Sequence, residues 1–111
     1  MPRKAESLIL MSPPKFHLRL SDRAKLDFRD ILSHTMQIWG ERQFIEYKGI
    51  LDAALKQIER NPDLGRERLL PGFRSFQAGN HVIFYRIDES SIHVVRILHG
   101  RMDFTRHLSE R

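Results

Sequence analysis

The last third of the chain gathers the side chains that RNA cleavage would require. Cleavage at a 2′-hydroxyl uses a general base, a general acid and cations that stabilise the phosphate. Arginines and histidines that could supply these groups recur toward the end of the chain, with one tyrosine among them. They are Arg74, Tyr85, Arg86, His93, Arg96, His99, Arg101 and His107. The same arginines could instead form ion pairs within the fold or bind acidic residues of a protein partner.

The sequence lacks the residues that disulfides, metal sites and several other kinds of catalytic site would require. The chain has no cysteine, which rules out disulfides and thiolate zinc sites. His93 and His99 would share a strand face but stand roughly 20 Å apart, too far to hold one metal ion. Neither a glycine-rich phosphate loop nor a nucleophile-elbow pattern occurs. The sequence therefore predicts neither a metal site nor a cofactor.

A β-hairpin is predicted to carry most of these candidates. Residues 82–87 and 92–98 are rich in β-branched and aromatic residues, and the polar run 88–91 separates them. In a symmetric hairpin Tyr85 faces Val94 and Ile83 faces Arg96. One face then needs a cover and carries Ile83, Tyr85, Ile87, Ile92, Val94 and Leu98. The other face mixes uncovered apolar residues with titratable ones: Val82, Phe84, Arg86, His93, Val95, Ile97 and His99.

The preceding chain can build the cover. Residues 15–20 alternate as a half-buried edge strand. Ser21 is a helix N-cap, and an apolar stripe from Ala24 to Ile38 predicts a helix that ends at Trp39-Gly40. A second helix ends at Asn61-Pro62, and residues 73–78 form a strand before the turn at 79–80. We expect an α+β fold of order β-α-α-β-β-β, with an antiparallel sheet packed on one face by a helical hairpin.

Length and charge limit the remaining possibilities. We expect residues 1–14 to be a flexible extension and residues 15–111 to form a single domain. No apolar run approaches the roughly 20 residues that cross a bilayer, so a cytoplasmic protein without membrane contacts is expected. The net charge of +5 and the isoelectric point near 10.1 favour an acidic partner, either a nucleic acid or a protein.

The order of several short motifs resembles the ParE toxins of the RelE/ParE type II toxin–antitoxin superfamily. The most specific part is the ending, Arg96-Ile97-Leu98-His99 followed by Arg101-Met102-Asp103 and His107-Leu108. The earlier matching residues are Leu20-Ser21, Ala24, Ile31, Trp39-Gly40, Tyr47, Asn61-Pro62, Gly65-Arg66, Gly72, Arg74, His81 and Tyr85-Arg86-Ile87. The resemblance covers about residues 16–108.

The resemblance implies a toxin that inhibits DNA gyrase and is neutralised by a ParD-type antitoxin, without direct sequence-specific DNA binding by the toxin alone. Target engagement is expected at Arg101, Met102, Asp103 and His107. Antitoxin binding is expected at Arg74, Val82, Phe84, Arg86, Val95 and Ile97.

An alternative is a ribosome-dependent mRNA endoribonuclease like RelE, which would use His99, Arg101, His107 and Arg86. Phe104 and His107 occupy the tail where such nucleases carry a tyrosine, so a protein inhibitor is the first expectation and an enzyme the second. Fold alone does not choose between the two activities.

Overall fold

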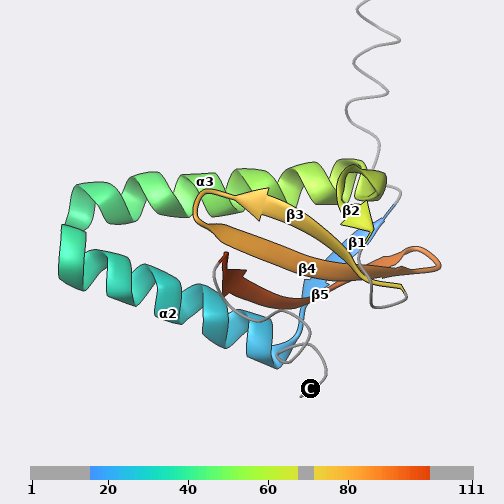
Figure 1. Ribbon diagram of the computed structural model, residues 1–111, viewed down its shortest axis with the longest axis horizontal. Helices are drawn as coiled ribbons and strands as arrows, with labels where there is room; N and C mark the ends of the chain where they lie inside the picture. The colour runs from blue at the N-terminus through green and yellow to red at the C-terminus, as the bar shows by residue number, and fades with distance from the viewer. Residues whose placement is uncertain (1–15, 68–71, 101–111) are drawn as a thin grey trace, which may run out of the picture.

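The described residues form a helical hairpin followed by a strand-rich second half (Figure 1). The computed structural model describes residues 16–67 and 72–100. Its elements are β1 (His17–Leu20), α2 (Asp22–Trp39), α3 (Glu41–Arg60), the 3₁₀ turn η1 (Pro62–Leu64), β2 (Arg66–Glu67), β3 (Arg74–Ala78), β4 (His81–Asp88) and β5 (Ser91–His99). The predicted α+β fold and element order are confirmed, with the two-residue β2 as an addition. The expected extension 1–14 lies outside the described residues.

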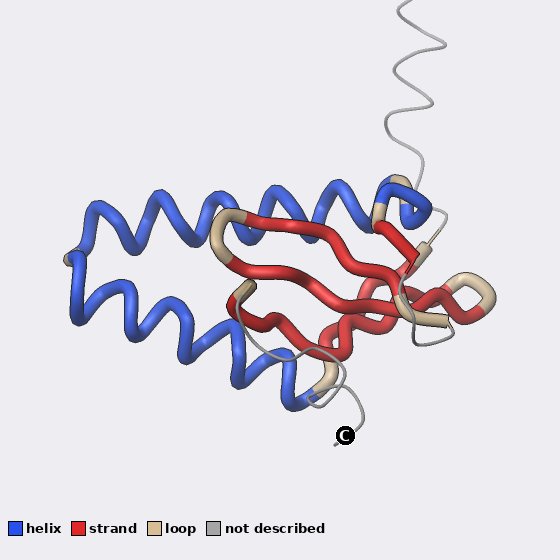
Figure 2. Tube along the Cα trace, viewed as in Figure 1, coloured by secondary structure: helices blue, strands red, loops and turns tan. Residues whose placement is uncertain are grey.

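The sheet is mixed, with strand order β1-β5-β4-β3-β2. Strands β3 to β5 pair antiparallel as predicted, and the additional β2 pairs antiparallel with β3. Strand β1 instead pairs parallel with β5, with His17 opposite Ser91. Parallel strands cannot be joined by a tight turn and need a long connection. The connection from β1 to β5 is long, because it begins with the helical hairpin directly after β1 and continues through β2, β3 and β4. Figure 2 shows the strands lying beside the two helices.

Local signals set the helix boundaries where the sequence predicts them. The Ser21 hydroxyl oxygen accepts a hydrogen bond from the backbone N–H of Ala24 at 3.0 Å, which caps α2. Gly40 joins the helices with a φ of 92°, a conformation that favours glycine. The second helix ends at Arg60, with Asn61 as its C-cap before Pro62. These predicted boundaries are confirmed.

A β-bulge in β5 changes the predicted assignment of side chains to faces. Tyr85 lies opposite Val94 as expected, but Phe84 lies opposite Arg96, so Val95 is the extra residue. Ile83 therefore faces Ile97 rather than Arg96. Beyond the bulge, Ile97 belongs to the core under the helices and Leu98 to the opposite face, so the predicted positions of these two residues were wrong.

Apolar side chains gather on both faces of the sheet. The larger cluster joins the helices to the face that carries Ile83, Tyr85 and Ile97, with Leu51 and Ile58 contributed by α3. The smaller cluster consists of Val82, Phe84, Val95 and Leu98, with Phe73 packed against it. Among the described residues, every member of this second cluster lies outside the helices.

The hairpin corner extends past the end of the sheet (Figure 1). Ile38 and Trp39 lie at this corner with 57% and 70% of their surface exposed. The prediction that Ile38 continues the buried stripe of α2 was wrong, because the sheet does not reach that far. Trp39 is the last residue of α2 and lies at the corner of the hairpin. Across the described residues, neither helix has the length and apolar character to cross a membrane.

Candidate functional site

Three arginines and a histidine line a hollow where β1, β4, β5 and the start of α2 meet. Its volume is about 370 Å³, and its lining includes Arg19, Arg23, Arg86 and His93. Arg19 and Arg86 are each the register partner of His93, so the three side chains lie side by side on one face of the sheet. The Arg86 side chain is exposed, and none of the described residues forms an ion pair with it.

Hydrogen bonds to β5 fix the start of α2 beside this hollow. The Ser21 hydroxyl, which caps the helix, also donates to the carbonyl oxygen of Val95 at 2.8 Å. The backbone N–H of Ser21 donates to the carbonyl oxygen of Val94 at 2.9 Å. The bulge at Val95 therefore gives the helix cap an acceptor, which determines where Arg23 emerges from the first turn.

An ion pair attaches the next turn of α2 to the same strand. The guanidinium of Arg96 donates two hydrogen bonds to the Asp27 carboxylate, at 2.8 Å from Nε and 3.0 Å from Nη2. Asp27 also accepts from the backbone N–H of Ile97 at 2.9 Å. This N–H lies past Val94, where the pairing with β1 ends. The strand–helix ion pair considered for Arg96 is present, and its role is structural.

A second hollow, of about 740 Å³, lies between the helical hairpin and the turn that joins β3 to β4. We call it the histidine groove. Aromatic and titratable side chains line it: Asp30, His34, Trp39, Tyr47, His81 and His99. The rings of His81 and His99 make an edge contact with centroids 5.5 Å apart, and His81 contacts the Tyr47 ring in the same way.

The Tyr47 hydroxyl anchors the β3–β4 turn to α3. Its oxygen accepts from the backbone N–H of Asn80 at 2.9 Å and lies 2.6 Å from Nδ1 of His81. Burial raises the pKa of Tyr47, so its hydroxyl stays neutral. Burial, and then the neighbouring charge of His99, lower the pKa of His81, with Asp27 acting weakly in the opposite direction. A neutral His81 suits the short contact with Tyr47.

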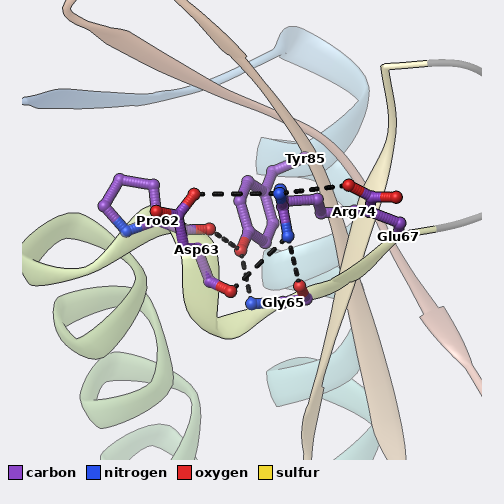
Figure 3. Close-up of polar contacts among 6 residues, drawn as sticks. All are labelled: Pro62, Asp63, Gly65, Glu67, Arg74 and Tyr85. Atoms are coloured by element: carbon purple, nitrogen blue, oxygen red, sulfur yellow. Dashed lines mark hydrogen bonds and ion pairs between the residues drawn. The ribbon is translucent and has the colours of Figure 1, made fainter.

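Tyr85 performs a similar anchoring role at the other end of the sheet (Figure 3). Its buried hydroxyl donates to the carbonyl oxygen of Pro62 and accepts from the backbone N–H of Gly65 at 2.9 Å. Arg74 donates to the carbonyl oxygen of Gly65 at 2.7 Å and pairs with Asp63. Several motifs that carry the family resemblance thus meet in one structural cluster, which explains their spacing.

The described nuclease candidates do not form one catalytic centre. His99 lies opposite His81 at one end of the β4–β5 pair, whereas Arg86 lies opposite His93 toward the other end. The two positions are five residues apart along β4, which corresponds to roughly 17 Å. Arg101 and His107 lie outside the described residues. The residues predicted for target engagement, Arg101, Met102, Asp103 and His107, also lie outside them.

The expected antitoxin-binding residues separate into three environments. Val82, Phe84 and Val95 are buried in the smaller cluster, so the expectation that they are uncovered was wrong. Ile97 lies in the core under the helices because of the bulge. Arg74 belongs to the Tyr85 cluster, and Arg86 alone of the set has an exposed side chain.

Two groups of residues were not found from the sequence. Arg19 and Arg23 join Arg86 and His93 only because β1 pairs with β5, and the sequence carries no sign of that pairing. Tyr47 and His81 are 34 residues apart. The glycine at position 79 was the available signal, since a Cβ there would lie 2.7 Å from the Tyr47 ring.

Comparison with known proteins identifies the family. The family described as "ParE toxin of type II toxin-antitoxin system, parDE" matches residues 18–104. "Toxin ParE1" of Caulobacter vibrioides is 38% identical over 92 residues, which cover 81% of this chain and 95% of that protein. "Toxin ParE1" of Mycobacterium tuberculosis is 39% identical, over 80% of this chain and 94% of that protein.

Solved structures share the fold at lower identity. A chain of the "Chromosomal ParDE TA system from P. aeruginosa" superposes with a TM-score of 0.70 at 18% identity, covering 78% of this chain and 98% of that chain. A chain of the toxin–antitoxin complex RelBE2 from Mycobacterium tuberculosis gives 0.55 at 20% identity, covering 77% and 98%. From the family match and the relatives above 30% identity, this chain belongs to the ParE toxins of type II toxin–antitoxin systems.

Proposed function

We propose that this protein inhibits DNA gyrase in the cytoplasm and is neutralised there by a ParD-type antitoxin. The match of residues 18–104 to the ParE toxins carries this proposal. The distribution of the described nuclease candidates supports it, because His99 and Arg86 stand at separate ends of the β4–β5 pair. Arg96, a further candidate, is held by Asp27. Engagement of gyrase by Arg101, Met102, Asp103 and His107 is part of the proposal.

We propose that the antitoxin binds mainly to the surface of the helical hairpin. Large apolar side chains on its surface have between 41% and 70% of their area exposed: Met36, Ile38, Trp39, Ile45 and Ile50. Exposed apolar surface of this kind marks interaction sites in soluble proteins. The histidine groove adjoins Trp39 and could receive side chains from an amphipathic antitoxin segment. Contacts at Val82, Phe84 and Val95 would require these buried residues to become accessible, whereas Arg86 is already exposed.

Supercoiling of relaxed plasmid by gyrase tests the choice of target. The purified full chain is added to gyrase with and without its antitoxin, and a translation-coupled mRNA cleavage assay is run in parallel. We expect inhibited supercoiling or stalled cleavage complexes, both reversed by the antitoxin, and intact mRNA. Normal supercoiling together with cuts in translated mRNA would replace this proposal with the endoribonuclease.

A further inference from the structure

The hollow lined by Arg19, Arg23, Arg86 and His93, which we call the cationic hollow, carries an excess of positive charge. Asp22 is the one acidic residue among those that line it. No described carboxylate lies within ion-pair distance of Arg19, Arg23 or Arg86. Elsewhere in the described chain, Arg74 and Arg96 are paired with acids. Like charges held close together repel one another unless an anion neutralises them.

The geometry suits an extended anion rather than a single carboxylate. Arg19, His93 and Arg86 come from three adjacent strands, so their row spans roughly 10 Å across the sheet. Arg23 adds a fourth donor from the first turn of α2, where the helix dipole also favours negative charge. The volume of about 370 Å³ is large enough for more than one phosphate group. Guanidinium groups match phosphate oxygens in charge and shape.

We propose that the cationic hollow binds the phosphodiester backbone of a nucleic acid strand. The chain's net charge of +5 supports the same chemistry, because basic patches on basic domains are the electrostatic footprint of nucleic acid binding. Backbone binding reads no sequence. The site goes beyond the proposed inhibition of gyrase and does not depend on it, since DNA and RNA offer the same phosphates.

The positions of Arg19 and Arg23 are built into the fold. β1 carries Arg19 two residues before the cap residue Ser21, whose two hydrogen bonds to β5 bring the first turn of α2 against the sheet. Arg86 and His93 face each other across the β4–β5 pair. Only the arginine side chains need to adjust when a strand binds, so the backbone is already arranged for the ligand.

Fluorescence anisotropy of short labelled oligonucleotides tests the site. The full-length protein is titrated into single-stranded DNA and RNA of mixed sequence between about 50 and 200 mM salt. Arg19→Gln and Arg86→Gln should each weaken binding roughly threefold to tenfold and reduce the slope of log K against log salt by about 0.7. Arg29→Gln is the matched control, because it removes the same charge from an exposed position of α2 outside the hollow.

Three results of the binding experiments would overturn the proposal. Absence of oligonucleotide binding at the lowest salt is the first, and an equal loss in Arg29→Gln is the second, since it would indicate diffuse attraction. The third is tighter binding of a polyglutamate peptide that Arg19→Gln and Arg86→Gln selectively weaken. Amide chemical-shift changes in the wild-type protein check the location independently of any variant. Added oligonucleotide should move residues 19–23, 86 and 93, and shifts confined to other regions would also overturn the proposal.

Discussion

The Asp27 carboxylate holds Arg96, a residue 69 positions later in the chain, through two hydrogen bonds. Only 14% of the Asp27 side chain and 9% of the Arg96 side chain are exposed. The same carboxylate accepts from a backbone N–H of β5. Helix α2 and strand β5 are thus joined by one acidic group that satisfies three donors.

We expect Asp27→Asn to lower the free energy of unfolding by about 3 kcal/mol, because it leaves a mostly buried guanidinium without its counter-charge. Urea denaturation measures the change. Asp30→Asn, an exposed position on the same helix, should change stability by less than about 0.5 kcal/mol. The double variant Asp27→Ala/Arg96→Met should be more stable than Asp27→Ala alone. Equal losses in Asp27→Asn and Asp30→Asn would show that the pair contributes nothing specific.

Tyr85→Phe should destabilise the protein by about 1–3 kcal/mol, because the carbonyl of Pro62 and the N–H of Gly65 lose their buried partner. Gly65→Ala should cost a similar amount, since its Cβ would lie 2.8 Å from ring atoms of Tyr85. Thermal unfolding compares both with Gly49→Ala, whose Cβ would meet open space. That control should stabilise α3 by about 0.5–1 kcal/mol. A neutral Tyr85→Phe would contradict the anchoring role.

Stability should fall as the pH drops below the ordinary pKa of histidine, in part because of His81. Burial and His99 lower the pKa of His81 in the folded protein. The unfolded chain therefore binds more protons below about pH 6.5, which favours unfolding. The contribution is present above that pH and is lost as the pH falls through the folded pKa.

Urea denaturation at several pH values isolates the histidine contribution. His81→Asn should reduce the difference in unfolding free energy between neutral and mildly acidic solution. His34→Asn is the control, because His34 is exposed and lines the same groove. If the pH dependence of stability were unchanged in His81→Asn and reduced in His34→Asn, the effect would come from His34 and the prediction for His81 would be wrong.

The proposed antitoxin site on the helical hairpin can be tested through Trp39. It is the single tryptophan of the sequence and is 70% exposed at the edge of the histidine groove. A tryptophan-free antitoxin segment should shift its emission to shorter wavelength as the indole leaves water. Trp39→Ala should weaken antitoxin binding by tenfold or more, as expected for a central aromatic contact.

The matched control for this binding experiment is Leu64→Ala, because Leu64 is an exposed apolar residue in η1, outside the residues that line the groove. Isothermal titration calorimetry of the three proteins with the same antitoxin segment gives the affinities. Unchanged emission together with equal affinities would place the antitoxin elsewhere on the toxin.

Local signals made the element order predictable, and long-range pairing limited the prediction of the site. The two helices have their caps at Ser21, Gly40 and Asn61. Capping and backbone conformation depend on neighbours in sequence, so these boundaries were predictable. The bulge at Val95 depends on how β5 lies against β4 and α2, and it moved Ile97 and Leu98 to opposite faces from those predicted. The cationic hollow forms only because β1 lies beside β5. The alternation of apolar and polar residues in a strand does not indicate which other strand it will pair with.

The parallel pairing of β1 with β5 also determines when the fold can be completed during synthesis of the chain. The Ser21 hydroxyl cannot donate its hydrogen bond to Val95 until that residue, 74 positions later in the chain, has been synthesised. At about 5–20 residues per second, a ribosome needs roughly 4–15 s to add that length. Throughout this interval the cap of α2 and the edge of β1 have no strand to bind. The nascent chain therefore cannot complete this pairing until nearly all of the described fold has been translated.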